Sequence, residues 1–268
     1  MSSKQRTWVL IGLWFLLGAN IFAWQYIIQS GGAKVVFFDV GQGDAIFIET
    51  KEGYQILIDG GPSRAVLGKL SKQLPFWDNS LDLVILTHPE KDHLAGLIGV
   101  LESYKVDMIL WTGIKNETTL FENWEKALEA EGAKVIVANA PQRIGSFGEV
   151  LYPEAGVQER ELNDTSIVTK WTFGNTSFLL TGDITRKIEK KLISLDIASS
   201  VLKVAHHGSK TSSSMDFLGA VNPSIAIIQV SERNSYGHPD PNILKRLNDL
   251  GISVLQTSKE GDIVFEYD

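Results

Sequence analysis

The sequence contains no cysteine, which excludes thiolate metal ligands, disulfide bonds and cysteine nucleophiles. It also lacks an excess of positive charge, since 25 Lys and Arg stand against 32 Asp and Glu, a formal net charge of -7. A general basic surface for nucleic acid is therefore not expected, and such a substrate would need a local basic patch or metal ions. No low-complexity linker divides the 268 residues, so we expect one large domain whose metal ligands are imidazoles and carboxylates.

Charge is also absent from residues 8–28, about 21 residues that read WVLIGLWFLLGANIFAWQYII. A helix of this length spans roughly the 30 Å hydrocarbon layer of a membrane. Lys4 and Arg6 precede the run and Lys34 is the next basic residue, so the positive-inside rule places the N-terminus in the cytoplasm. We therefore predict a single-pass cell-membrane anchor over residues 1–30, with residues 31–268 facing the exterior. A cleaved signal peptide, which would give a secreted protein, is the alternative.

Apolar runs rich in β-branched and aromatic residues predict the strands of the remaining chain. In the first half, strands are expected at 35–38, 45–49, 54–58, 83–86, 108–110 and 134–138, with helices at 94–104 and 119–131. In the second half we expect a hairpin around Gly174 and Asn175, a helix over 184–195, a strand over 201–205, a helix near 241–250 and a last pair of strands. This alternation of strands and helices predicts an α/β layered fold.

Polar residues follow several of these strands directly: Asp59, His88, Asp183 and the pair His206 and His207. Active sites of layered α/β proteins gather at strand ends, where loops converge. We therefore expect these side chains to meet at one edge of the fold.

The segment THPEKDHLAG, residues 87–96, holds the densest group of metal-binding side chains. Alternate residues of an extended loop point the same way, so His88, Glu90 and Asp92 can converge, and His93 turns inward where a helix begins. Four nitrogen and oxygen donors in six residues suit a two-metal site, in which a bridging water is deprotonated and attacks an electrophile. Taken alone, the segment also fits a solvated turn before a helix.

An ordered set of motifs carries a family resemblance over residues 33–268. In chain order it resembles the metallo-β-lactamase-like domain of the ComEC/Rec2 competence-protein family at FFDVGQGDAIFI (37–48), ILIDGG (56–61), THPEKDHLAG, NDTSIV (163–168), LLTGD (179–183), LKVAHHGS (202–209) and NSYGHP (234–239). The resemblance implies a four-layer αββα metallo-β-lactamase sandwich, here preceded by one transmembrane helix. That superfamily holds one or two metal ions at an edge of its sheets.

The resemblance also implies a metal-ligand set: His88, Glu90, Asp92, His93, Asp164, Asp183, His206 and His207. Asp183 matches the acid that bridges two metals. Either His206 or His207 matches the distal histidine, and the choice stays open. Asp164 stands where many superfamily members have a histidine, so it is either a ligand or the former of an Asx turn.

Other residues are expected to assist the site. Asp92, Asp183 and His238 are the candidate catalytic residues, with His238 donating to a phosphoryl oxygen or leaving group, or else lying on the surface. Asp59 resembles a carboxylate that orients a ligand imidazole, with a turn former as its alternative. Residues expected around the metals or the substrate are Asp39, Gln42, Asp44, Asn163, Ser166 and Ser209. Lys91, Lys203 and Lys210 near the loops are expected to be solvated surface lysines, with local phosphate contacts as the alternative.

These residues together predict a metal-dependent hydrolase. Carboxylates in place of imidazoles harden the site, which favours manganese over zinc among divalent ions and favours phosphate-oxygen chemistry. A nuclease or phosphodiesterase acting on DNA during uptake, through a metal-bound hydroxide, is the first hypothesis. A cell-wall or small-molecule phosphoesterase and a catalytically inactive binding module are the alternatives. Competence proteins of this family also carry a multi-span channel domain, so a separate channel protein is a possible partner.

Overall fold

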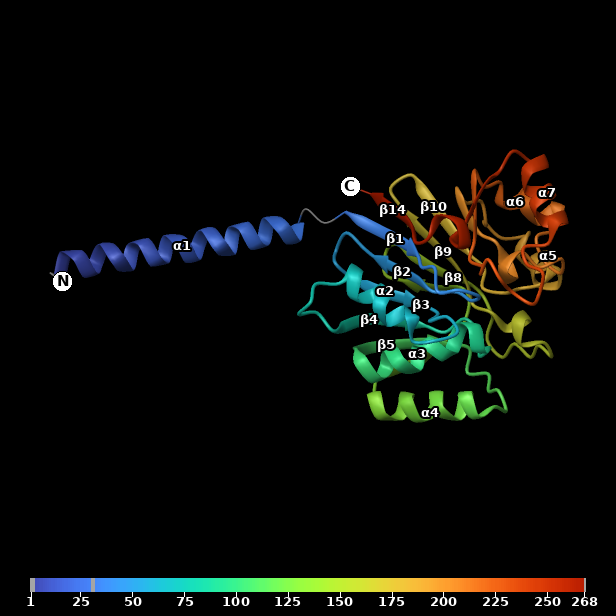
Figure 1. Cartoon of the computed structure of the whole chain (residues 1–268), viewed down its shortest axis with the longest axis horizontal. Helices are drawn as coiled ribbons and strands as arrows, with labels where there is room; N and C mark the ends of the chain where they lie inside the picture. The colour runs from blue at the N-terminus through green and yellow to red at the C-terminus, as the bar shows by residue number, and fades with distance from the viewer. Residues whose placement is uncertain (1–2, 30–31, 268) are drawn as a thin grey trace.

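The computed structural model describes residues 3–29 and 32–267, with side chains over 4–20 and 32–267 (Figure 1). Helix α1, Ser3–Gln29, covers the predicted anchor, and its described apolar side chains are exposed, Trp14 and Phe15 at 73% and 77%. Over the described part of the chain, no helix combines the length and apolarity needed to cross a membrane. The side chains of residues 21–28, the C-terminal part of the predicted anchor, lie outside the described residues.

The rest of the chain contains two seven-stranded sheets and the helices that connect their strands (Figure 1). The first has the order β14-β1-β2-β3-β4-β5-β6, from strands Ile263–Tyr267, Ala33–Phe37, Ile46–Glu49, Gln55–Ile58, Ser80–Ile85, Lys105–Trp111 and Lys134–Val137. The second has the order β13-β12-β11-β10-β9-β8-β7, from strands Ser253–Gln256, Ile225–Ile228, Val201–Lys203, Thr176–Leu180, Val168–Phe173, Gly148–Tyr152 and Gln142–Ile144. The predicted hairpin around Gly174 is confirmed, because β9 and β10 pair antiparallel with Phe173 opposite Thr176.

Side-chain alternation along the strands divides the interior into three apolar layers. Val35 and Phe37 of β1 face the second sheet, whereas Val36 faces the helices on the outer side of the first sheet. Those helices are α2 (Ala65–Gln73), α3 (Lys91–Ser103) and α4 (Thr119–Glu131). The outer side of the second sheet packs on α5 (Arg186–Leu192), α6 (Met215–Val221) and α7 (Pro241–Asp249). The predicted αββα sandwich is therefore confirmed.

Several elements differ from the expectation. Helix α2, strands β7 and β8, helix α6 and the short helix α8 (Thr257–Glu260) were not expected from the apolar pattern. The strand expected over 201–205 ends at Lys203, and a 3-10 turn, η2 (Ala205–Gly208), follows it. A second 3-10 turn, η1 (Leu162–Thr165), leads into β9. Both turns are held by residues distant in the sequence, since the Tyr152 hydroxyl donates to Asp164 O and Asp240 N donates to Gly208 O, and a local hydrophobic pattern does not report such contacts.

The parallel strands of both sheets end at the same edge of the sandwich. In the first sheet β3 and β4 are parallel, and in the second β10, β11 and β12 are parallel. A hydrogen bond from Ile167 N to Thr87 O, 3.0 Å, ties the two sheets together at this edge. The loops that follow these strands therefore converge there, as expected for α/β layers.

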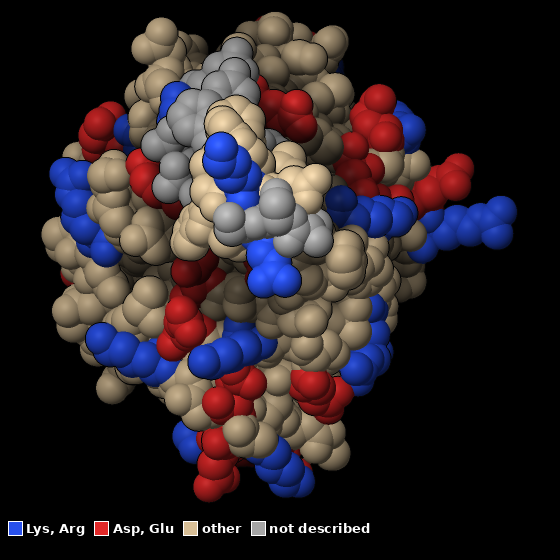
Figure 2. Space-filling model, turned by 90° about the vertical axis from the view of Figure 1, so that its left-hand side faces the viewer, with Lys and Arg blue, Asp and Glu red and all other residues tan. Residues whose placement is uncertain are grey.

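The surface at the α1 end of the molecule carries both signs of charge. Figure 2 shows Lys and Arg side chains interspersed with Asp and Glu on this face. This mixture agrees with the net charge of -7 in giving no general basic surface on the face shown.

Candidate metal centre

Close backbone packing places the loop after β3 against the start of α3. Gly60 N donates to His93 O at 2.8 Å, and Gly96 N donates to Gly61 O at 3.0 Å. A Cβ atom at Gly96 would lie 1.8 Å from Gly60 O, so only glycine allows this approach. The glycine that ends THPEKDHLAG therefore lets the helix carry His93 up to Asp59.

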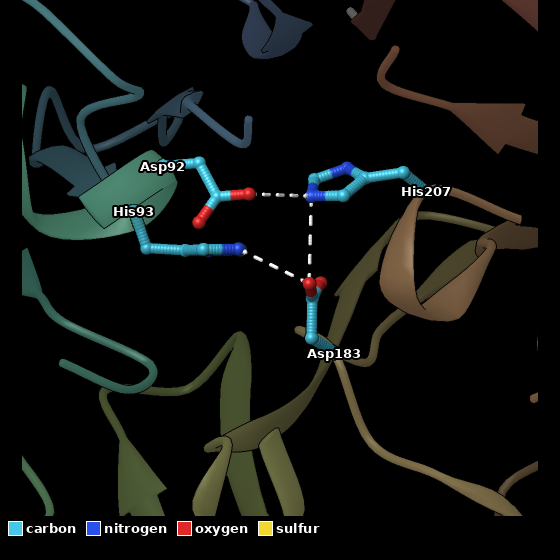
Figure 3. Close-up of side chains that lie close together, drawn as sticks. All are labelled: Asp92, His93, Asp183 and His207. Atoms are coloured by element: carbon cyan, nitrogen blue, oxygen red, sulfur yellow. Dashed lines mark hydrogen bonds and ion pairs between the residues drawn. The ribbon is translucent and has the colours of Figure 1, made fainter. Parts of the chain in front are cut away.

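Four side chains meet at the converging strand ends: Asp92, His93, Asp183 and His207 (Figure 3). One nitrogen or oxygen atom from each lies within 4.8 Å of the others. His93 Nε2 is 3.3 Å from Asp183 Oδ2, and His207 Nε2 is 3.4 Å from the same oxygen and 3.3 Å from Asp92 Oδ2. Asp92 comes from the first turn of α3, and its side chain is 24% exposed while the other three are buried. The group therefore opens to solvent beside Asp92.

Hydrogen bonds hold two of these imidazoles in one tautomer. His93 Nδ1 lies 2.7 Å from Asp59 Oδ2, and this carboxylate also accepts from the Thr87 backbone and hydroxyl. His207 Nδ1 donates to Gln229 O at 2.8 Å. Because both Nδ1 atoms carry a proton that is donated to a fixed acceptor, both Nε2 atoms are directed toward Asp183 and are free to lose their own proton to a metal ion. Asp59 and Gln229 thus orient the imidazoles as supporting residues do around metal ions.

His88 is held in the same way by two hydroxyl groups. Its Nδ1 is 3.0 Å from Thr87 Oγ1 and 3.3 Å from Ser166 Oγ. Thr87 gives its own proton to Asp59, and Ser166 gives its own to Asn163 O. Both hydroxyls therefore accept from His88 Nδ1, which leaves Nε2 as an acceptor.

The donor set fits a divalent cation. Within the described residues, His88 Nε2 and His93 Nε2 are buried and have no hydrogen-bond partner. Their rings are neighbours, with centroids 4.1 Å apart. A buried lone pair facing carboxylate oxygens is unfavourable unless a proton or a cation lies between them. Imidazole and carboxylate donors in this arrangement match the ligands of manganese and zinc.

The ionisation of the cluster shows the same need for positive charge. Burial opposes protonation of His93, but Asp183 and Asp59 raise its pKa well above the usual value. Burial opposes ionisation of Asp183, but His207, His93 and Lys203 hold its pKa well below the usual value. Without a metal ion, protons on the imidazoles therefore supply the charge that the carboxylates require.

Lys203 is part of this centre, although its sequence suggests a surface lysine or a phosphate contact. Its side chain is 0% exposed, and its Nζ atom pairs with Asp44, lies 3.2 Å from Asp183 Oδ1 and donates to Gly182 O at 2.9 Å. The prediction of a solvated surface lysine is wrong, because Lys203 lies on β11 and its side chain points between the two sheets. Its position inside the apolar run VLKVA is the signal that could have revealed this.

The structure distinguishes the two neighbouring histidines. In η2, His206 and His207 have φ of 53° and 52°, and Gly208 has φ of 80°. This left-handed turn points the two rings in different directions. His207 lies in the cluster, whereas His206 is partly buried beside Thr211 Oγ1 and its ring centroid is 5.6 Å from that of His238.

Asp164 and Glu90 lie outside the four-residue cluster. Asp164 Oδ1 accepts from the Thr185 hydroxyl at 2.6 Å and from Thr185 N at 3.3 Å, at the start of α5. Glu90 precedes α3, and burial together with Asp92 and Asp183 raises its pKa. The Glu90 carboxyl group therefore interacts electrostatically with the cluster, whereas the Asp164 carboxylate is hydrogen-bonded to Thr185 at the start of α5.

The remaining expected residues surround the centre at different depths. Asp44 is buried behind His93 and His207, while Asp39 Oδ1 accepts from Gly41 N within its own turn. Gln42 accepts from Ser231 N. The two serines have separate tasks: Ser166 accepts from Asp183 N at 3.0 Å, and Ser209 bonds Thr211.

Comparison with known proteins agrees with this architecture. A family model described as the metallo-beta-lactamase superfamily matches residues 38–231. The chain is 30% identical over 268 residues to ComE operon protein 3 of Bacillus subtilis, covering 90% of this chain and 34% of that protein. It is 29% identical over 243 residues to competence protein ComA of Neisseria gonorrhoeae, covering 89% of this chain and 33% of that protein. The chain thus spans about a third of the length of these relatives.

A solved structure supports the fold independently. The metallo-beta-lactamase fold protein YhfI from Bacillus subtilis matches with a TM-score of 0.59 at 17% identity, over 88% of this chain and 99% of YhfI. The similarity to competence proteins agrees with the resemblance carried by the sequence motifs. The family match, the two-sheet topology and the Asp and His cluster lead to one conclusion: this chain belongs to the metallo-beta-lactamase superfamily.

Proposed function

We propose that this protein is a metal-dependent hydrolase that cleaves phosphodiesters, with DNA as its substrate. The observation that carries the proposal is the common state of three imidazoles. His88, His93 and His207 each have Nδ1 hydrogen-bonded to a fixed partner, and the Nε2 atoms of His93 and His207 lie beside the carboxylates of Asp92 and Asp183. Such an arrangement is preorganised for cations rather than for a packed core.

Asp92, His93, Asp183 and His207 would hold one divalent ion, and His88 with Glu90 would serve a second. When bound, such an ion supplies a Lewis acid that stabilises charge on phosphoryl oxygens and activates water. The protein's own contribution is positioning: Asp59 and Gln229 aim the imidazoles, as described above. Asp92, the partly exposed member, faces the side from which substrate enters.

The substrate proposal draws on similarity to competence proteins and on local charge. Lys91 and Lys210 are exposed near the centre and are candidates for phosphate contacts. The net charge of -7 favours a smaller phosphodiester over a long duplex, so a cell-wall or small-molecule phosphoesterase is the competing proposal. The chain spans about a third of the length of its competence relatives, and we propose a separate channel protein as a partner in DNA uptake.

The test uses the full-length protein, stripped of metal and reloaded with manganese or zinc. Single-stranded DNA, duplex DNA and a simple phosphodiester are offered to the wild type, to Asp92→Ala and to a control variant, Asp107→Ala, at an exposed acid on β5. We expect cleavage to need metal, to fall at least about 100-fold in Asp92→Ala, and to persist in Asp107→Ala. Activity that survives both metal removal and Asp92→Ala would contradict the proposal. Cleavage of the simple diester without DNA would favour the competing substrate.

A location at the outer face of the cell membrane is a separate proposal. Its support is the run of exposed apolar side chains on α1, which includes Trp8, Leu13 and Phe15. We expect the protein to stay with the membrane fraction during alkaline high-salt washing. Release into the wash would overturn the anchor.

A further inference from the structure

A row of aromatic and imidazole rings leads from solvent to the metal centre. Tyr236 is 69% exposed, and its ring centroid lies 5.8 Å from that of His238, at an interplanar angle of 33°. The His238 ring lies 5.6 Å from that of His206, which is 6.3 Å from the ring of His207 in the cluster. Tyr236 therefore stands at the outer end of a path that ends at the metal ligands.

The loop that presents Tyr236 is held by one side chain. Asn234 Oδ1 accepts from Tyr236 N at 3.2 Å and from His238 N at 3.0 Å. Asn234 Nδ2 donates to Ser231 O at 3.0 Å and to His238 O at 2.7 Å. Ser231 N in turn donates to Gln42 of the loop that carries Asp44. An aromatic ring held by such a loop loses little further freedom when it binds a ligand.

Ligand chemistry follows from what surrounds the exposed ring. The Tyr236 ring is largely exposed to solvent, and Arg233, three residues earlier in the same loop, is exposed as well. His238 Nδ1 is buried and has no hydrogen-bond partner in the described part of the chain, and the half-buried His238 ring lies between Tyr236 and His206 as a polar group behind the exposed ring. A flat π-system joined to a phosphate matches this combination of ring, cation and polar group.

We propose that Tyr236 is a specificity-determining residue that stacks on a nucleobase flanking the scissile phosphate of single-stranded nucleic acid. This inference rests on the proposed phosphodiesterase function and names its substrate class. Base stacking on an aromatic side chain is tolerant of sequence, since every base has a π-face. The enzyme would therefore select for the presence of a base, without selecting which base it is.

The experiment compares two single-stranded oligonucleotides, one of thymidines and one in which tetrahydrofuran abasic residues replace them. The manganese-loaded full-length protein should cleave the intact strand at least about fivefold more efficiently, measured as kcat/KM. Tyr236→Ala should lower cleavage of the intact strand to the abasic level and leave the abasic strand unchanged, while Tyr236→Phe keeps the preference. Tyr54→Ala is the matched control, because Tyr54 is 50% exposed and precedes β3, at the end opposite the metal centre.

Failure of this inference can be separated from failure of the proposed function. Equal cleavage of both strands by the wild type, or an equal loss on both in Tyr236→Ala, would overturn the stacking role and leave the phosphodiesterase intact. If the wild type cleaves neither strand, the proposed function fails, and fluorescence anisotropy with the labelled strands decides the stacking role. Tighter binding of the intact strand that disappears in Tyr236→Ala supports it, and equal binding overturns it.

Discussion

Replacing Lys203 by methionine tests whether a buried cation balances the metal centre. The Lys203 side chain is 0% exposed and pairs with two buried carboxylates, Asp44 and Asp183. Methionine keeps nearly the same volume, so little cavity forms and the loss is mainly electrostatic. Removing one partner of a buried ion pair costs about 3–5 kcal/mol, since the remaining charge is left uncompensated. We therefore expect Lys203→Met to destabilise the metal-free protein by that amount.

The assay is thermal unfolding of the metal-free protein in a chelator. For a chain of this size, the expected cost corresponds to a fall in Tm of roughly 6–20 °C. Adding Asp44→Asn to Lys203→Met removes one of the two uncompensated carboxylates, so the double variant should recover part of the loss, with a coupling of roughly 0.5–3 kcal/mol. A fall in Tm below about 3 °C, or strict additivity of the two substitutions, would refute the charge-balance argument.

Three further predictions concern the same centre. The pKa of His93 and of His207 is raised in the folded, metal-free protein, so their stabilisation is complete below the unfolded value of about 6.5 and is lost as pH rises through the folded values. The metal-free protein should therefore lose stability as pH rises above about 6.5 in denaturant titrations, and a flat profile would contradict this. Asp59→Asn should weaken metal binding about 10- to 100-fold in competition titrations, because His93 loses the acceptor that fixes its tautomer, and unchanged affinity would dismiss that role. His207→Ala should reduce the metal content measured by elemental analysis, whereas His206→Ala should retain it, and the reverse result would exchange their assignments.

The layered fold was accessible from the sequence because its cause is local. Consecutive apolar residues such as Val35, Val36 and Phe37 mark a strand buried on both faces, and strands of this kind alternate with helices along the chain. Elements with a weaker hydrophobic pattern, including β7 and α6, were not predicted. β7 is three residues long and α6 is seven, too short for a clear period.

The site was accessible only in part, for a related reason. Motif spacing identified His88, Asp92, His93 and Asp183, which follow strands or begin a helix whose direction is set locally. The partner that each side chain selects is decided by contacts between distant segments. Asp164 lies near α5 and bonds Thr185, a pairing across 21 positions of the chain.

By itself, the sequence determined the chemistry available to this protein: no thiolate, several imidazoles and carboxylates at strand ends, and a layered α/β fold to bring them together, with the two-sheet sandwich implied by the family resemblance. Tertiary structure alone decided which of two adjacent histidines turns inward, through the left-handed backbone of η2, and why Lys203 is buried between Asp44 and Asp183. The physical reason is that propensity and periodicity act over a few neighbouring residues. Ligand orientation depends on groups from distant segments of the chain, and charge balance depends on pairs such as Lys203 and Asp44, which meet only when the two sheets pack.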